Sequence, residues 1–230
     1  MEIQAIIFDM DGLMLDTEPL YRIVWKRAAA ECGYIVTDEI YRGLVGRGRK
    51  VAEEILQQTF GPDFPMEKFR RLSREDEVRA FSFDPVARKP GLDELLSFVE
   101  SRHLPKAVAT STERAIALPL LERMGLLHRF VAVATGDEVT RGKPNPDIFL
   151  LAADKLGVAP CSCLALEDSE AGVTSAANAD MQVYLVPDLV KPSPEVERLA
   201  SGIFDSLADV AKHLEETFDS PKPANSQREA

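Results

Sequence analysis

The feature that most constrains the fold of this chain is a regular alternation of short apolar runs with helix-like stretches. The runs are short enough to be buried strands, and in the stretches between them apolar residues recur at helical spacings. Strands that alternate with helices predict a parallel sheet covered on both faces, the doubly wound α/β class. The predicted strands are 3–8, 107–109, 130–134, 163–166 and 182–186, and the predicted helices between them are 92–99, 116–124, 148–156 and 171–177.

One interval is too long for this pattern. A strand–helix–strand unit takes roughly 30 residues, but the first two predicted strands lie about three times farther apart. The segment between them carries helical patterns at 20–31, 51–59 and 66–79. We therefore expect a Rossmann-like core formed by residues 1–17 and 86–217, with an inserted helical cap domain at 18–85.

The junctions of this insertion resemble hinges. One lies around 16–19, and the other is the stretch FSFDPVARKPG, in which Pro85, Pro90 and Gly91 interrupt regular structure. Hinges at both ends of an insertion predict a cap that opens and closes over an active site. The polar, proline-containing end at 218–230 is expected to be a disordered tail.

Charge and composition exclude several classes of protein. A formal net charge of −11 opposes a general role on nucleic acid or anionic membrane, where a basic face is expected. No uncharged apolar stretch approaches the ~18 residues of a membrane span, and the spacing of Cys32, Cys161 and Cys163 fits neither a zinc site nor a redox pair. We expect a cytoplasmic protein, monomeric or weakly homo-oligomeric, with free thiols and no nucleic-acid or membrane partner.

The strongest chemical signal is the segment FDMDGLMLD. A buried-looking strand delivers Asp9 and Asp11 to its carboxyl end, where ligands bind in open α/β sheets, and Gly12 permits a sharp turn. Residues two apart on an extended segment point the same way. The two carboxylates therefore converge, and a cation would offset their repulsion. The competing interpretation is an acidic turn after a strand.

Two further segments place polar residues after predicted strands. Thr110, Ser111 and Thr112 follow the predicted strand 107–109 and stand at the start of a predicted helix, whose free N–H groups can bind phosphate. A helix N-cap is the alternative interpretation of Ser111 or Thr112. In RGKPNPDIF, Asn145 can cap a helix, which leaves Lys143 free to reach inward unless it is simply solvated.

A fourth segment, CLALEDSEAG, places Glu167 and Asp168 after a strand of small apolar residues. Carboxylates there can complete an oxygen-ligand shell for Mg²⁺. Alternatively they are the acidic first turn of a helix. Four such coincidences at one sheet edge are less plausible than any single one.

Together the four segments resemble the four motifs of the haloacid dehalogenase superfamily, in order and in strand-end setting. The resemblance implies that Asp9 is the nucleophile and Asp11 the general acid and base. It further implies that Thr110 and Lys143 bind phosphate, and that Mg²⁺ is held by Asp9, Asp11, Glu167 and Asp168, with Asp11 acting through its backbone carbonyl. The helical insertion resembles the subgroup of β-phosphoglucomutase and the sugar-phosphate phosphatases, and DTEPLY and GKPNPDIFL resemble its phosphatase branch.

The resemblance also suggests substrate contacts from the cap, where LVGRGRK would face the active site. A solvated basic loop is the alternative. The predicted substrate-binding residues are Gly12, Gly46, Arg47, Arg49, Ser111 and Thr112. Tyr21 and Trp25 are assigned to the core of the cap.

These observations predict a Mg²⁺-dependent phosphatase that hydrolyses a small phosphorylated metabolite through an aspartyl phosphate. A phosphomutase is the nearest alternative, but its branch carries a histidine after the first motif, where this chain reads TEPLYR. A dehalogenase would leave Asp11 without a use, because a departing halide needs no proton. A non-catalytic sensor of phosphorylated metabolites is a third possibility, which the complete set of motifs opposes.

Overall fold

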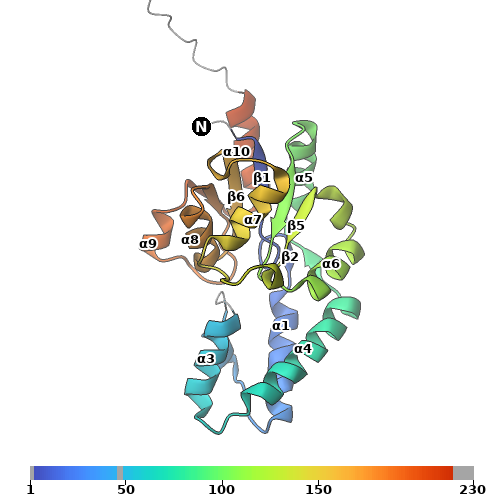
Figure 1. Cartoon of the computed structure of the whole chain (residues 1–230), viewed down its shortest axis with the longest axis vertical. Helices are drawn as coiled ribbons and strands as arrows, with labels where there is room; N and C mark the ends of the chain where they lie inside the picture. Colours follow the sequence, from blue (N-terminus) through green and yellow to red (C-terminus); the bar gives the residue numbers. More distant parts are fainter. Residues whose placement is uncertain (1–2, 46–48, 220–230) are drawn as a thin grey trace, which may run out of the picture.

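The computed structural model describes residues 3–45 and 49–219. The predicted substrate contacts Gly46 and Arg47 lie outside the described residues. Figure 1 shows two bodies, one built around a sheet and the other made of helices, joined where α1 (Glu18–Glu31) and α4 (Met66–Phe83) meet the sheet-containing body. None of the described helices is both long and apolar enough to cross a membrane.

The larger body contains a six-stranded parallel sheet with the order β5-β4-β1-β6-β7-β8. From the central strand β1 the chain moves outward to β4 and β5, then crosses back to the other side of β1 for β6. The strands are β1 (Ala5–Phe8), β4 (Lys106–Ala109), β5 (Ala132–Ala134), β6 (Cys163–Glu167), β7 (Gln182–Leu185) and β8 (Gly202–Ile203). This order places a topological switch point beside β1, where open α/β sheets bind ligands.

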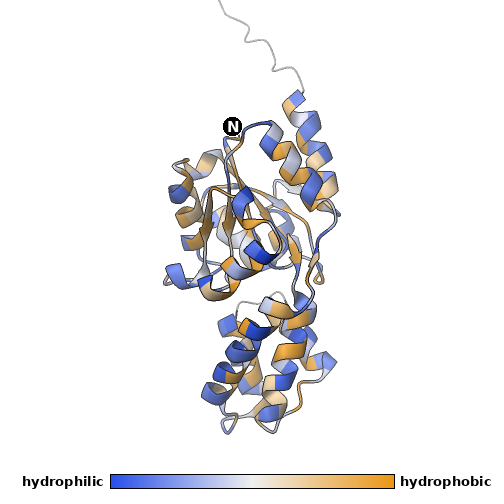
Figure 2. Ribbon diagram, turned by 90° about the vertical axis from the view of Figure 1, so that its right-hand side faces the viewer, coloured by the Kyte–Doolittle hydropathy of each residue, from blue (hydrophilic) through white to orange (hydrophobic). Residues whose placement is uncertain are grey.

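Helices cover both faces of the sheet because successive side chains of its strands point to opposite sides. Ile6 and Phe8 of β1 belong to one apolar cluster, whereas Ala5 and Ile7 belong to another. The first cluster is completed by α5 (Leu92–Ser101), α6 (Arg114–Arg123) and α10 (Leu207–Asp219), and the second by α7 (Asp147–Leu156) and α8 (Glu170–Asn178). Figure 2 shows the mainly hydrophobic strands between these helices. The doubly wound α/β prediction is confirmed.

The helical body has its own apolar cluster, made of side chains from its helices and from the connections between them. Trp25 and Phe69 meet edge-on in it, with ring centroids 5.5 Å apart. Besides α1 and α4, this body contains α2 (Asp38–Arg42) and α3 (Arg49–Phe60). An amphipathic helix is stable mainly through the burial of its apolar face, so these helices hold one another in place.

The two expected hinges are paired with each other. The short strands β2 (Leu15–Asp16) and β3 (Ala87–Arg88) are antiparallel neighbours, although about seventy residues separate them along the chain. Lys89, directly after β3, forms an ion pair with Asp188 of the core at 2.5 Å. The insertion thus leaves and re-enters the core at one place.

Some elements have no counterpart in the prediction. The short α2, α9 (Pro194–Glu197) and β8 carry too few residues for a periodic pattern. Helix α10 runs to Asp219, so the predicted tail boundary at 218 is wrong by two residues. Phe218 packs against Phe98 of α5 with ring centroids 5.9 Å apart, and this contact holds the last described turn of the helix against the core.

Candidate active site

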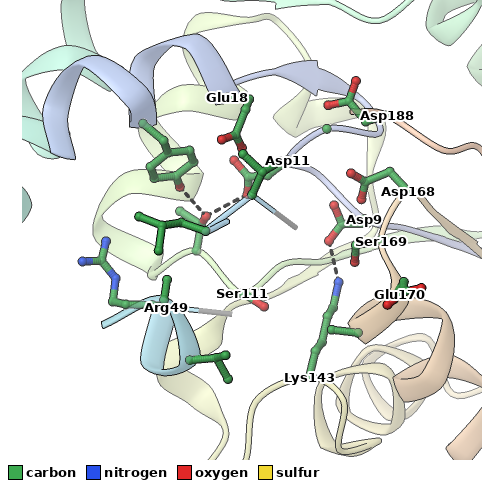
Figure 3. Close-up of a pocket in the computed structure, with 18 of the residues that line it drawn as sticks. Asp9, Asp11, Glu18, Arg49, Ser111, Lys143, Asp168, Ser169, Glu170 and Asp188 are labelled. Carbon is green, nitrogen blue, oxygen red and sulfur yellow. Dashed lines mark hydrogen bonds and ion pairs between the residues drawn. The ribbon is translucent and has the colours of Figure 1, made fainter. Parts of the chain in front are cut away.

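The candidate site lies at the carboxyl ends of β1, β4 and β6, on the side of the sheet-containing body that faces the helical body. A cavity of about 740 Å³ opens there and is lined from both bodies. Figure 3 shows Asp9, Asp168 and Lys143 on its core side, with Arg49 of α3 on the other side. A cavity with convergent polar groups at this edge of the sheet is the expected place for a substrate.

Asp9 and Lys143 form the centre of the site. Lys143 Nζ lies 2.5 Å from Asp9 Oδ1 and 2.5 Å from Glu167 Oε1, and all three side chains are at least nine-tenths buried. Burial opposes the charged form of Lys143, but the two carboxylates outweigh it and raise the lysine pKa. Burial also raises the pKa of Asp9, while Lys143 opposes that rise. Lys143 is therefore a buried cation and not a solvated loop residue.

Glu167 is held by the amino end of α8. Its Oε2 accepts hydrogen bonds from the backbone N–H groups of Asp168 and Ser169 and from Ser169 Oγ, at 3.0–3.2 Å. The carboxylate lies over Gly172, where an added Cβ would stand 1.8 Å from Glu167 Oε1. Glu167 thus has little freedom to move, and Gly172 is required for its position.

A group of three carboxylates could hold a cation. One oxygen each from Asp9, Glu167 and Asp168 lie within 4.8 Å of one another. Burial, followed by the charges of Glu167 and Asp9, raises the pKa of Asp168, and the charge of Lys143 opposes that rise. A hard cation with oxygen ligands, such as Mg²⁺, fits this donor set.

The carboxylate of Asp11 lies outside that group and has different neighbours. Its Oδ2 accepts hydrogen bonds from Thr110 Oγ1 at 3.0 Å and Thr112 Oγ1 at 2.8 Å. Its Oδ1 is buried and has no hydrogen-bond partner among the described residues. Burial raises the pKa of Asp11, and the bonds from the threonines reduce that rise. The two aspartates of the first motif therefore have separate environments.

The backbone near the site requires a glycine at position 12, and it shows which of the predicted helix caps are present. Gly12 has a φ of +87°, and a Cβ there would lie 2.2 Å from Asp168 Oδ2. Ser111 and Thr112 line the cavity, but neither is an N-cap, because α6 begins after Glu113. Likewise α7 begins after Pro146, and the Asn145 side chain donates to the carbonyl of Gly142 instead.

Several cavity-lining residues were not among the predicted contacts. Asp188 follows β7 at the same sheet edge, so the strand-end signal that identified Asp9 and Glu167 could have identified it as well. Tyr21 and Trp25, assigned to the core of the cap, also reach the cavity. The polar additions from the helical body, Glu18, Tyr41 and Glu77, come from helices α1, α2 and α4 and lack a comparable signal.

The chain is similar to known proteins over most of its length. The model of the haloacid dehalogenase-like hydrolases matches residues 3–180. The phosphorylated carbohydrates phosphatase of Thermotoga maritima is 36% identical over 179 residues, 78% of this chain and 82% of that protein. The fructose-1-phosphate phosphatase YqaB of Escherichia coli is 37% identical over 180 residues, 77% of this chain and 93% of that protein. The crystal structure of β-phosphoglucomutase from Clostridium difficile matches with a TM-score of 0.76 at 25% identity, covering 94% of this chain and 97% of that one.

The order of the four strand-end segments, the geometry of the cavity and these likenesses lead to one assignment. The chain belongs to the haloacid dehalogenase-like hydrolase family.

Proposed function

We propose that this enzyme hydrolyses the phosphate monoester of a small phosphorylated carbohydrate, with Mg²⁺ as its cofactor and Asp9 as a covalent nucleophile. The observation that carries the proposal is the contrast between the two aspartates. Asp9 lies in a charged cluster with Lys143. Asp11 is bound by neutral hydroxyls, and its buried Oδ1 has no hydrogen-bond partner among the described residues. Two acids with different environments are suited to different tasks in one reaction. Two similar proteins named as sugar-phosphate phosphatases support the substrate class.

In the first step an oxygen of Asp9 attacks phosphorus, and the bond from phosphorus to the ester oxygen breaks. Asp11 donates its proton to the departing oxygen, so the carbohydrate leaves as an alcohol. The raised pKa of Asp11 favours a carboxyl group that still carries this proton.

In the second step Asp11, now ionised, takes a proton from water. The resulting hydroxide attacks the phosphorus of the aspartyl phosphate, which releases inorganic phosphate and restores Asp9. Asp11 regains its proton, and no other reactant is needed.

Charge on the transferred group is balanced by residues on the core side. Lys143, which contacts Asp9, and the hydroxyl of Thr110 would stabilise the equatorial oxygens. Asp9, Glu167 and Asp168 would hold Mg²⁺ through side-chain oxygens, and Asp11 would contribute its backbone carbonyl. When bound, the cation neutralises charge on the phosphate and on the crowded carboxylates.

The test is phosphate release from a panel of sugar phosphates, nucleotide phosphates and phosphoglycolate, with and without Mg²⁺, beside Asp9→Asn. The amide is nearly isosteric but is not a nucleophile, so we expect release to fall by at least about 10³-fold. An undiminished Asp9→Asn enzyme would contradict the covalent mechanism. Isomerised sugar phosphate in place of released phosphate would indicate a mutase, the activity named for the Clostridium difficile structure.

A further inference from the structure

The cap side of the cavity carries a carboxylate that the proposed reaction does not use. Glu18 is the first residue of α1, is partly buried and lines the cavity. Figure 3 shows its side chain next to Asp11. Burial raises the pKa of Glu18, a hydrogen bond from Tyr41 opposes the rise, and the charges of Asp188 and Asp11 add to it. Since Asp11 is the proposed acid for the departing oxygen, Glu18 lies on the side of the cavity that would hold the alcohol part of the substrate.

Tyr41 fixes the orientation of Glu18. The hydroxyl of Tyr41, on α2, donates to Glu18 Oε1 at 2.6 Å, and Tyr41 lines the cavity as well. Burial, followed by the charge of Glu18, raises the pKa of Tyr41, so the phenol keeps the proton that it donates. A hydroxyl that has donated its proton can only accept from a ligand, and an ionised carboxylate accepts up to about four hydrogen bonds. The pair therefore presents acceptors to the cavity and calls for a donor on the ligand.

A hydroxyl group suits this position better than an ammonium group, the other common donor. Apolar side chains line the cavity from both bodies, with Leu44 and Val45 on the cap and Leu189 and Val190 on the core. The C–H groups of a polyol can pack against such a wall while its hydroxyl groups reach Glu18. A compact, strongly hydrated ammonium ion would lose water against the same wall, which costs free energy.

We infer, on the basis of the proposed function, that Glu18 is a specificity-determining residue that accepts a hydrogen bond from a hydroxyl group of the departing carbohydrate. Glu18 contacts the alcohol part of the substrate and not the transferred phosphate. A site built to accept from a hydroxyl discriminates against an analogue without it, because the acceptor then loses water and gains no donor.

The experiment compares kcat/KM for fructose 1-phosphate and hexyl phosphate in the full-length enzyme with Mg²⁺. The two compounds have the same number of carbon atoms, but the hexyl group carries no hydroxyl. We expect the wild type to prefer the sugar phosphate by at least about tenfold. Glu18→Gln keeps the shape of the side chain and an oxygen to accept from Tyr41, but it removes the charge and turns an N–H₂ group toward the ligand. The preference should fall by about tenfold, the worth of a charge-assisted hydrogen bond.

Tyr41→Phe should reduce the preference by a smaller factor, because Glu18 keeps its charge and loses only the bond that orients it. Glu39→Gln, exposed on α2, is the matched control and should leave the preference unchanged. Circular dichroism verifies that each variant is folded. A merely structural role of Glu18 would lower both kcat/KM values alike, so an unchanged ratio in Glu18→Gln overturns the inference.

Two results with the wild type would also overturn it. One is turnover of hexyl phosphate that equals turnover of the sugar phosphate. The other is a preference for phosphoethanolamine over fructose 1-phosphate that Glu18→Gln abolishes, because this result would show that Glu18 binds an ammonium group.

Calorimetric binding separates this inference from the proposed function. Fructose 1-phosphate should bind Asp9→Asn about tenfold more tightly than the double variant Asp9→Asn/Glu18→Gln, with little change for hexyl phosphate. That result, without phosphate release by the wild type, would defeat the proposed function and leave the role of Glu18 standing. Equal binding of the sugar phosphate to both variants would overturn the role of Glu18, whatever the turnover.

Discussion

The hydroxyl of Tyr21, on cap helix α1, lies 3.0 Å from Thr112 Oγ1 in the core. Thr112 Oγ1 in turn donates to Asp11 Oδ2 at 2.8 Å. A hydroxyl has one proton, so Thr112 accepts from Tyr21 while it donates to the carboxylate. Burial, and then the charge of Asp11, raises the pKa of Tyr21, which keeps its proton available at neutral pH. The position of the cap is thereby coupled to the orientation of Asp11.

This chain of hydrogen bonds predicts that Tyr21→Phe lowers kcat by about five- to tenfold, the effect of losing one neutral hydrogen bond. KM should change less, because Tyr21 positions Asp11 without contacting the reacting phosphate. Steady-state kinetics measure both constants. Tyr34→Phe is the control, since Tyr34 lies in the aromatic cluster of the cap with Phe60 and Phe64. A loss confined to KM would argue against a positioning role.

From the carboxylate cluster we expect that Mg²⁺ reverses the order of thermal stability of the wild type and Asp168→Asn. In EDTA this variant should melt at a higher temperature than the wild type, because one of three mutually repelling acids is neutral. Mg²⁺ at a hundredfold above its Kd should stabilise the wild type by about 2.7 kcal/mol and the variant much less. Thermal unfolding with and without Mg²⁺ tests this. Asp188 lies outside the cluster, so Asp188→Asn should keep the stabilisation by Mg²⁺. Loss of that stabilisation in Asp188→Asn would show that the cation binds elsewhere.

Glu100 predicts a pH-dependent contribution to stability. A hydrogen bond from Arg129, opposed by burial and aided by Lys106, holds the Glu100 pKa at about 2, below its ordinary 4.5. The lowered pKa means that the ionised form stabilises the fold above pH 4.5, and that this stabilisation disappears as pH falls toward 2.

Glu100→Gln should therefore lower the free energy of unfolding by about 1 kcal/mol at pH 7, a modest loss because the side chain is 42% exposed. The difference from the wild type should shrink between pH 4.5 and 3 in urea titrations. Glu94→Gln, on the exposed side of the same helix, serves as the control. A difference that stays constant with pH would contradict the assignment.

Gly91 lies between β3 and α5 and has a φ of +83°. A Cβ there would lie 2.0 Å from the backbone nitrogen of Ala208. Gly91→Ala should destabilise the protein by about 3 kcal/mol or more, because backbone strain and a backbone clash add. Gly157→Ala has a similar φ of +68° but nothing within 4 Å, so it should cost only about 1–2 kcal/mol. Equal losses in chemical denaturation would show that the clash is relieved by movement of α10.

Local pattern was enough to predict five of the six strands of the sheet and the polar residues that follow them. The apolar runs of β1, β4 and β6 mark strands, and parallel strands bring their carboxyl ends to one edge, so Asp9, Thr110 and Glu167 could be expected there. The pairing of β2 with β3 could not be predicted. Each is only two residues long, and the two become neighbours only when the chain returns from the cap.

The sequence by itself determined which residue types occupy the strand ends and that a helical segment interrupts the core. Only the tertiary structure decided that Asp11 faces threonines while Asp9 faces Lys143. It also decided that Tyr21 meets Thr112 and that Glu77 pairs with Arg49. The physical reason is one of range. Helix and strand periodicity depends on residues a few positions apart, whereas these partners lie between 28 and 134 positions apart and meet only through packing.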